Sequence, residues 1–547
     1  MMNELHENLF KLLIELDTLC RENDIDYFLS GGTALGAIRN QCFLPWDDDI
    51  DLFITRENWK KLYELFSNNP DILPENRDLV CIENTKFYRN PIARYVDTST
   101  TRIYPSQAVA GKTCGDQIEF FILDPIPNVE DGQDEHLKMM DVFFEVLSPY
   151  FVVSKFLTVE GFEEHKDLVF KYYDKIDKEG YSKVIRELYD KGFTYPAEKA
   201  DTVRLRWGMR NGLYKKRWFE GKRYELLEGH EFPVAGELEH ALRNDYGDTW
   251  MYIPESLGQV SHNFIIEDLD KPFKEFTDIY LRFIDQEAVV RDYETNKRNN
   301  VDLWPLRREI RLEKEKLIGI LTRKELGVTI ENNGYDVEEL LKNREFDTLN
   351  KLFDKYYSIQ LSHYSKRFNL MIEIDETLQK IAIANKIQQG QFYTGDTILT
   401  IIEKNKGLND SLKELKEICE YCRKLSIAIF DNYDEETVRD LLNKIPQGYE
   451  NLVDVFKATL WLKLKTASST EDYESIINEG NEFLKLYPED GELMSHIAEA
   501  YFNLGNIEKA KEFYDNAVHN TRNGFVWRKA KENVGIDRMA EEEIYVD

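Results

Sequence analysis

The chain has 547 residues, of which 42% are apolar and 32% are charged, a composition typical of soluble globular proteins. Because this length exceeds what one compact core organises, we expect two or three domains. The formal net charge of −31, from 71 basic and 102 acidic residues, opposes nonspecific attraction to anionic surfaces and argues against a nucleic-acid partner.

Leucines at helical spacing predict a helix over residues 3–22, which leads into an apolar strand that begins near Tyr27. This strand ends at Gly31, Gly32 and Thr33, and an amphipathic helix follows. Glycines let the backbone approach a phosphate closely, and the unpaired amides at a helix start supply hydrogen-bond donors and a positive dipole end. We therefore expect a phosphate-binding turn at this point.

A carboxylate-rich run comes next and contains Asp47, Asp48, Asp49 and Asp51. Apolar residues interleave with its end, which favours a strand packed on a core over a solvated acidic loop. Asp49 and Asp51 then point to the same face, a spacing that lets two carboxylates share a divalent cation. Without a cation or basic groups, such crowded carboxylates repel each other by roughly a few kcal/mol.

The rest of the N-terminal half predicts a mixed sheet with helices on it. We expect a helix at 59–66 and strands at 80–82, 92–96 and 118–123. Residues 135–230 have few strand signals and predict long charged helices that form a wall around the acceptor site. The fold class expected here is α+β.

From about residue 300 the pattern changes to helix after helix, including one expected at 368–383. Small and aromatic residues between Met494 and Ala517 have the spacing of one tetratricopeptide repeat, which favours an α-solenoid of paired helices over an irregular bundle. Such a surface usually binds a protein or peptide; bracing of the front domain or self-association are the alternatives. The expected domains are 1–295, 300–440 and 441–547.

The six cysteines predict reduced thiols, because neither an export signal nor a transmembrane run is found and the protein is expected to be cytoplasmic. Cys419 and Cys422 form a lone CxxC in a helical pattern. Since no second pair and no histidine cluster accompanies it, a zinc or redox role is disfavoured.

Two ordered blocks of sequence carry a resemblance to a known family. The first is Gly-Gly-Thr-Ala-Leu-Gly-Ala-Ile-Arg at 31–39 with Pro-Trp-Asp-Asp-Asp-Ile-Asp at 45–51, and the second runs from Phe232 through Tyr246-Gly-Asp to Pro254 and His262. Together they resemble LicD-type phosphocholine transferases, a group related to the fukutin proteins with a nucleotidyltransferase fold. The resemblance covers about residues 1–290.

The resemblance implies transfer of phosphocholine, or a related phospho-alcohol, from a CDP-choline-like donor to a sugar hydroxyl of a glycan or lipid-linked glycan, with release of CMP. Mg²⁺ (or Mn²⁺) would be held by Asp49, Asp51 and a third carboxylate. Glu119 is the preferred third ligand because apolar strand residues flank it, and Asp124 is the alternative. These carboxylates would also be the catalytic residues.

The same resemblance implies a set of substrate-binding residues, namely Gly31, Gly32, Thr33, Arg39, Asp47, Asp48, Arg94 and His262. The guanidinium of Arg39 would form bidentate hydrogen bonds with phosphate oxygens. The alternative interpretation is a surface cation paired with the acidic run. Tyr246 and Asp248 have the composition of a turn. A quaternary ammonium would need aromatic faces, and the chain offers Trp46, Tyr95, Tyr104, Trp207, Trp218, Tyr246 and Trp250.

Two other functions compete with this one. A true nucleotidyltransferase would use the same carboxylates and release pyrophosphate, and a scaffold would use only the helical repeats. A lipid-linked acceptor would place the protein peripherally at the inner face of a membrane. Docking would then need a local basic patch, for which residues 215–224 are the densest basic and aromatic stretch, unless they form a solvated face.

Overall fold

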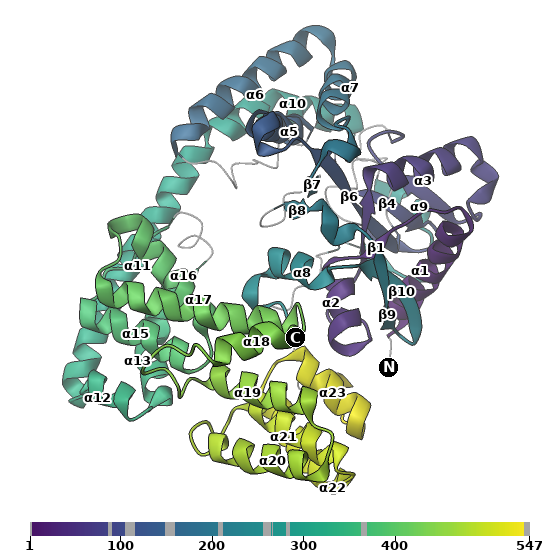
Figure 1. The fold of residues 1–547 in the computed structure, drawn as a ribbon. Coiled ribbons are helices and arrows are strands. Elements are labelled where there is room, and N and C mark those ends of the chain that lie inside the picture. The colour runs from purple at the N-terminus through teal and green to yellow at the C-terminus, as the bar shows by residue number, and fades with distance from the viewer. Residues whose placement is uncertain are drawn as a thin grey trace. The chain divides into compact units, whose positions relative to one another are not determined.

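The computed structural model describes residues 3–85, 90–103, 115–147, 159–205, 212–254, 264, 266–280, 285–362 and 369–540. The chain divides into two compact units. The first comprises the chain up to Trp304 with a short stretch from Asp537 onward, and the second comprises Pro305–Ile536. The expected fold class is confirmed, because a mixed sheet with helices is followed by a helical region (Figure 1). A boundary near residue 440 stays a prediction.

The central sheet of the first unit runs in the order β1-β2-β6-β4-β3, and β7 and β8 extend it from β6. Its strands are β1 (Phe28–Leu29), β2 (Ile50–Thr55), β3 (Arg77–Val80), β4 (Ala93–Asp97), β6 (Gln117–Ile126), β7 (Thr202–Leu205) and β8 (Leu213–Lys215). The pair β2 and β6 is parallel and the other pairs are antiparallel. All of β6 is buried, which fits its apolar composition and its central place.

Three helices position the ends of β2 and β6. They are α1 (Glu4–Glu22), α2 (Gly31–Asn40) and α3 (Arg56–Asn68). The predicted leucine face of α1 is buried, and the side chain of Asn3 caps the helix by accepting a hydrogen bond from the His6 amide at 2.8 Å. Helix α2 packs on β2, and α3 packs on both β2 and β6. The start of α2 therefore lies beside the strand that carries the aspartates.

The prediction of a mostly helical segment at 135–230 is right for its first part and wrong for its second. Helices α5 (Gln133–Leu147), α6 (Val159–Glu179) and α7 (Tyr181–Gly192) pack together around an apolar cluster. After them come β7, β8 and β9 (Lys222–Leu227), and β9 forms a hairpin with β10 (His230–Ala235). Gly221 and Gly229, both with positive φ, bracket β9, so its charged residues belong to a half-exposed strand and not to a helix.

The remaining elements of the first unit follow the hairpin or lie at its margin. They are β5 (Thr101–Ile103), α8 (Leu238–Tyr246), β11 (Ile266–Asp268), α9 (Phe273–Tyr280) and α10 (Gln286–Asp302). Strands β5 and β11 form a separate antiparallel pair. This pair joins the segment after β4 to the segment that follows the second resemblance block.

The second unit is made of packed helix pairs, as expected. Its helices are α11 (Trp304–Asn333), α12 (Val337–Lys342), α13 (Phe346–Gln360), α15 (Glu376–Gln388), α16 (Phe392–Lys406), α17 (Asp410–Phe430), α18 (Glu435–Leu442), α19 (Val453–Thr466), α20 (Thr470–Leu484), α21 (Gly491–Asn503), α22 (Ile507–Asn520) and α23 (Gly524–Val534). The helix expected at 368–383 begins only at Glu376, where Asp375 accepts the amides of the first turn. The predicted repeat coincides with the α21 and α22 hairpin, and its tetratricopeptide identity stays a prediction.

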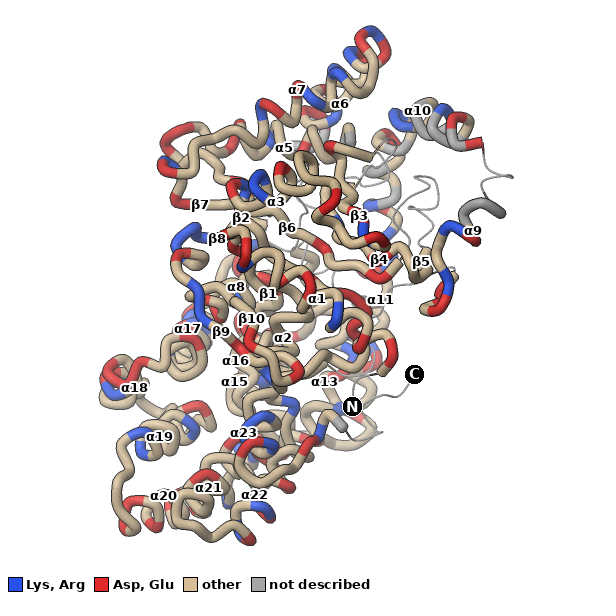
Figure 2. Tube along the Cα trace, turned by 90° about the vertical axis from the view of Figure 1, so that its right-hand side faces the viewer, with Lys and Arg blue, Asp and Glu red and all other residues tan. Residues whose placement is uncertain are grey.

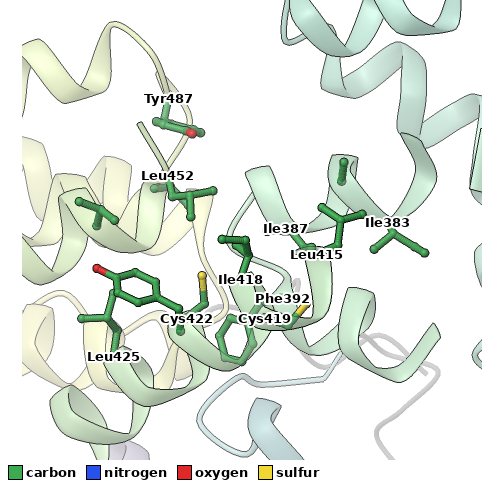
Figure 3. Close-up of a cluster of buried hydrophobic side chains, with 14 of the residues drawn as sticks. Ile383, Ile387, Phe392, Leu415, Ile418, Cys419, Cys422, Leu425, Leu452 and Tyr487 are labelled. Atoms are coloured by element: carbon green, nitrogen blue, oxygen red, sulfur yellow. The ribbon is translucent and has the colours of Figure 1, made fainter. Parts of the chain in front are cut away.

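Cys419 and Cys422 lie in the apolar core of the second unit, among side chains such as Ile387, Leu415 and Leu425 (Figure 3). Both are fully buried. Burial raises the pKa of Cys419 to about 12 and that of Cys422 well above its usual range. Since the thiolate is the reactive form, both residues act as small apolar side chains.

In the native chain, a disulfide reagent at mildly alkaline pH should therefore leave Cys419 and Cys422 unlabelled. The partly exposed Cys42 serves as the accessible control, and guanidinium chloride should expose all of them. Peptide mapping by mass spectrometry measures the labelling. Rapid native labelling of either core thiol would contradict the structure.

Candidate metal and phosphate site

Three carboxylates meet at the junction of β2 and β6. Asp49, Asp51 and Glu119 each offer an oxygen, and these atoms all lie within 4.8 Å of one another. The parallel register places Asp51 directly opposite Glu119, and Asp49 immediately precedes β2. The structure therefore brings together the three residues that the sequence singled out as metal ligands, and an acidic triad of this kind could hold a metal ion.

The electrostatics of the triad fit a divalent cation. Burial raises the pKa of Asp51 well above its ordinary value, and the charges of Asp49 and Glu119 raise it further. Arg94, which the resemblance implied as a substrate-binding residue, is buried and forms an ion pair with Glu119. Its Nε donates to Glu119 at 2.8 Å, and the Nε2 of Gln117 donates to the same oxygen at 3.0 Å. Arg94 thus holds a carboxylate of the triad.

The first turn of α2 lies against these carboxylates. A Cβ on Gly31, whose φ is +54°, would lie 2.0 Å from Asp51 Oδ2, and one on Gly32 would lie 2.2 Å from Asp47 Oδ2. Only glycine leaves room for carboxylates at this approach. The Asp51 amide donates to the Thr33 hydroxyl at 3.0 Å, so Thr33 also anchors β2 to the helix.

Arg39 is not the surface cation that was its alternative reading. It is 3% exposed, and within the described residues its Nε has no hydrogen-bond partner and its guanidinium has no ion pair. Burial lowers the pKa of Arg39 to about 9, which still leaves it charged at neutral pH. A buried cation without a counter-charge is costly, and a bound anion would remove that cost.

Tyr246, which the sequence offered as a turn residue and as one of several aromatic candidates, belongs to the same site. Burial raises the pKa of Tyr246 well above its ordinary value, and the charge of Asp51 raises it further, whereas Arg39 lowers it. The phenol therefore lies within electrostatic reach of both the triad and the buried guanidinium. The second resemblance block was the signal that could have placed it here.

Asp48 forms an ion pair with an arginine that the sequence did not single out. Arg102, on β5, is 1% exposed and donates to the Asp48 backbone carbonyl. Its Nη2 also lies 3.5 Å from the Asp48 carboxylate, and its guanidinium stacks on Phe264 at 3.9 Å. Arg102 therefore fixes the acidic loop, which competes with a direct substrate role for Asp48.

The other predicted residues are placed as follows. His262 and two of the aromatic candidates, Tyr104 and Trp207, lie outside the described residues. Tyr95 donates to Glu15 at 2.5 Å in the core, and Trp218 stacks on His240. Among the described aromatic candidates, Trp250 is fully buried, Trp46 is partly exposed and directly precedes Asp47, and Tyr246 lies within electrostatic reach of Asp51.

Asp124, the alternative third ligand, forms a separate ion pair. It is fully buried, and its Oδ1 accepts from Arg56 Nε at 2.5 Å. Arg56 also donates to the Tyr189 hydroxyl at 2.7 Å, which ties β6 to α3 and α7. Within the described carboxylates it is Glu119, not Asp124, that completes the triad.

Asp124→Asn should lower the free energy of unfolding by about 3 to 5 kcal/mol, because it leaves the Arg56 guanidinium buried without its counter-charge. Denaturant melts of the purified variant measure this loss. Glu57→Gln on α3, where the side chain is 75% exposed, is the control and should change stability little. Equal stability of the two variants would refute the structural role of Asp124.

Comparison with known proteins finds a family model that matches part of the first unit. Residues 24–113 match the nucleotidyltransferase domain of the LicD/FKTN/FKRP family, a range that contains Asp49 and Asp51 and ends before Glu119. The lipopolysaccharide cholinephosphotransferase LicD of Haemophilus influenzae is 25% identical over 254 residues, which are 45% of this chain and 89% of that protein.

The other sequence matches are shorter, and the comparison with solved structures finds no match. Uncharacterized proteins of Rickettsia prowazekii and Rickettsia typhi are each 39% identical over 51 residues, 9% of this chain and 19% and 16% of theirs. The front unit is thus similar over residues 24–113 to the nucleotidyltransferase domain of that family and has a distant cholinephosphotransferase relative.

Proposed function

We propose that the chain transfers a phospho-alcohol, phosphocholine being the first choice, from a CDP-activated donor to a sugar hydroxyl of a glycan or lipid-linked glycan, with release of CMP. The observation that carries this proposal is the triad of Asp49, Asp51 and Glu119 at the start of α2, in a domain of LicD type. Phosphoryl transfer depends mainly on positioning and charge stabilisation, and this site supplies both.

Each residue of the site has a task in this proposal. Asp49, Asp51 and Glu119 would hold Mg²⁺ or Mn²⁺, which when bound supplies charge neutralisation for phosphate oxygens. The open amides at Gly31 and Gly32 donate to the donor's diphosphate, and Arg39 neutralises its charge. Glu119, already bonded to Arg94, accepts the proton of the acceptor hydroxyl or stays a ligand.

Nucleotidyl transfer is a second candidate function, because the matched domain is a nucleotidyltransferase domain. The identity of the product distinguishes the two reactions. CMP release with the phospho-alcohol on the acceptor supports the first. Nucleotide on the acceptor, with pyrophosphate released, supports the second. Mass spectrometry of the acceptor distinguishes the two.

A thermal-shift screen chooses the donor. With Mg²⁺ present, a ligand that binds only the folded chain raises its melting temperature, so one of CDP-choline, CDP-ethanolamine, CDP-ribitol and CDP-glycerol should do so. CMP is the control for binding of the cytidine portion of the donor, and ATP is the control for binding of its diphosphate portion. A shift with ATP alone would favour the nucleotidyl reading.

The helical unit and the location of the protein remain further parts of the proposal. We assign the repeats of α19–α23 to a protein or peptide partner, by analogy with helical-repeat surfaces in general. None of the described helices is long and apolar enough to cross a membrane. A cytoplasmic enzyme that attaches peripherally to a membrane is compatible with a lipid-linked acceptor.

A further inference from the structure

Helix α11 has two apolar faces, and only one of them is packed. On the packed face, a Cβ on Gly319 would lie 2.5 Å from Ile372 Cδ1, and Leu326 is 5% exposed. The opposite face exposes Leu306 by 55%, Ile310 by 63%, Leu317 by 58%, Leu321 by 58% and Val328 by 48%. Their spacing of four and seven residues keeps them on one side of a helix.

This face is unusual for the molecule. Of the twelve large apolar side chains that are strongly exposed among the described residues, seven lie between Leu303 and Val328. Basic and acidic positions both recur along the traces of other helices, such as α6, α7 and α22 (Figure 2). Contiguous exposed apolar surface marks a binding face, whereas scattered apolar residues do not.

Two lysines lie within the same face. Lys314 follows Ile310 by four residues and Lys324 follows Leu317 by seven, and neither makes an ion pair with a described residue. Helix α11 carries seven Lys and Arg against five Glu, in a chain where acidic residues outnumber basic ones by 102 to 71. The helix is thus a locally basic segment of an acidic protein. We call Leu306, Ile310, Lys314, Leu317, Leu321, Lys324 and Val328 the α11 stripe.

The chemistry of the α11 stripe fits an anionic lipid surface better than a second copy. The seven-residue repeat of Leu303, Ile310 and Leu317 continues into Lys324. If two copies of α11 paired along this repeat, the contact would bury a lysine from each copy and bring two basic helices together, which is unfavourable. At a bilayer surface, apolar side chains enter the acyl boundary while lysines extend to headgroup phosphates.

We propose that the α11 stripe binds the surface of an anionic phospholipid bilayer, with the helix axis parallel to the membrane plane. The five exposed apolar side chains of the stripe, interleaved with two lysines that make no ion pair with a described residue, carry this assignment. The binding is independent of the proposed transferase activity. It brings the chain to the surface where a lipid-linked acceptor would reside.

Vesicle flotation of the full chain tests the proposal. Vesicles of phosphatidylcholine and phosphatidylglycerol in equal parts should carry the wild-type protein, and vesicles of phosphatidylcholine alone should carry it ~tenfold less. The double variant Lys314→Glu/Lys324→Glu should lose binding to the anionic vesicles ~tenfold or more. Leu317→Ser/Leu321→Ser should lose it at every salt concentration, because the apolar contribution is not screened.

The matched control is Ile507→Ser/Lys511→Glu on α22, which changes an exposed apolar side chain and an exposed lysine of the same unit. This variant should bind like the wild type. Circular dichroism melts should show all variants folded, because every altered side chain is exposed. Absence of binding to anionic vesicles, or equal loss in the control, would overturn the proposal.

Light scattering after size exclusion provides the other decisive outcome. A dimeric wild type that becomes monomeric in Leu317→Ser/Leu321→Ser would show that a second copy covers the α11 stripe. That result would also overturn the proposal. A protein whose oligomeric state is the same in both forms, and which binds vesicles only with the stripe intact, supports it.

Discussion

Asp51→Asn should reduce turnover by about three orders of magnitude or more while leaving the metal-free fold intact. Burial and the neighbouring carboxylates raise the pKa of Asp51 well above its ordinary value, so its charge at neutral pH opposes folding. An uncharged isostere relieves this repulsion and removes a ligand oxygen from the triad. Steady-state transfer assays with Mg²⁺ measure the loss, and thermal melts in a chelator should show equal or higher stability.

The matched comparison is Asp124→Asn, which makes the same chemical change at another buried aspartate of the first unit. Asp124 is paired with Arg56 and not with the triad, so its variant should lose stability and keep metal dependence. Near-normal Mg²⁺-dependent turnover in Asp51→Asn would refute the assignment of the triad. A loss of stability equal to that of Asp124→Asn would refute the electrostatic argument.

Arg39→Met should weaken donor binding by ~10- to 150-fold, the equivalent of about 1.5 to 3 kcal/mol for a hydrogen bond to a charged group. It should not destabilise the free protein, because it removes a buried guanidinium that has no ion pair within the described residues. Calorimetric titration with the donor measures the first effect, and denaturant melts measure the second.

Arg56→Met is the control for this variant, since Arg56 is also a buried arginine but has a carboxylate partner. That variant should unfold more easily and, where folded, bind donor normally. Unchanged donor affinity in Arg39→Met would remove Arg39 from the phosphate site. Strong destabilisation by Arg39→Met would assign it a structural role instead.

Local patterns in the sequence predicted most of the site. The alternation of Asp49 and Asp51 required only the two-residue period of a strand, and Gly31 and Gly32 required only the conformational freedom of glycine. Glu119 was reached by combining its apolar neighbours with a family resemblance. The parallel register that sets it opposite Asp51 is a long-range pairing, which local spacing does not encode.

The misses have a common physical origin in tertiary contacts. Arg102 was not singled out, because its importance comes from Asp48, which lies on a different segment. Tyr246 reads as part of a turn because its approach to Asp51 depends on how α8 packs on α2. Strand β9 reads as a charged helix face because its pairing with β10, not its own propensity, makes it a strand.

The exposed face of α11 shows the converse. The pattern after residue 300 correctly predicted helices, but periodicity alone did not reveal that one apolar face of α11 stays uncovered. Only burial along the helix separates the packed residues from the exposed ones. The sequence therefore predicted the element and the structure identified its unoccupied surface.

The most direct test of the central claim is calorimetric titration of CDP-choline into the wild-type chain with Mg²⁺, with a chelator, and into Asp51→Asn with Mg²⁺. We expect binding with Mg²⁺ and a loss of at least ~tenfold in affinity both with the chelator and in the variant, since each would remove the cation whose charge neutralises the donor's phosphates. Equal affinity under all three conditions would contradict the account.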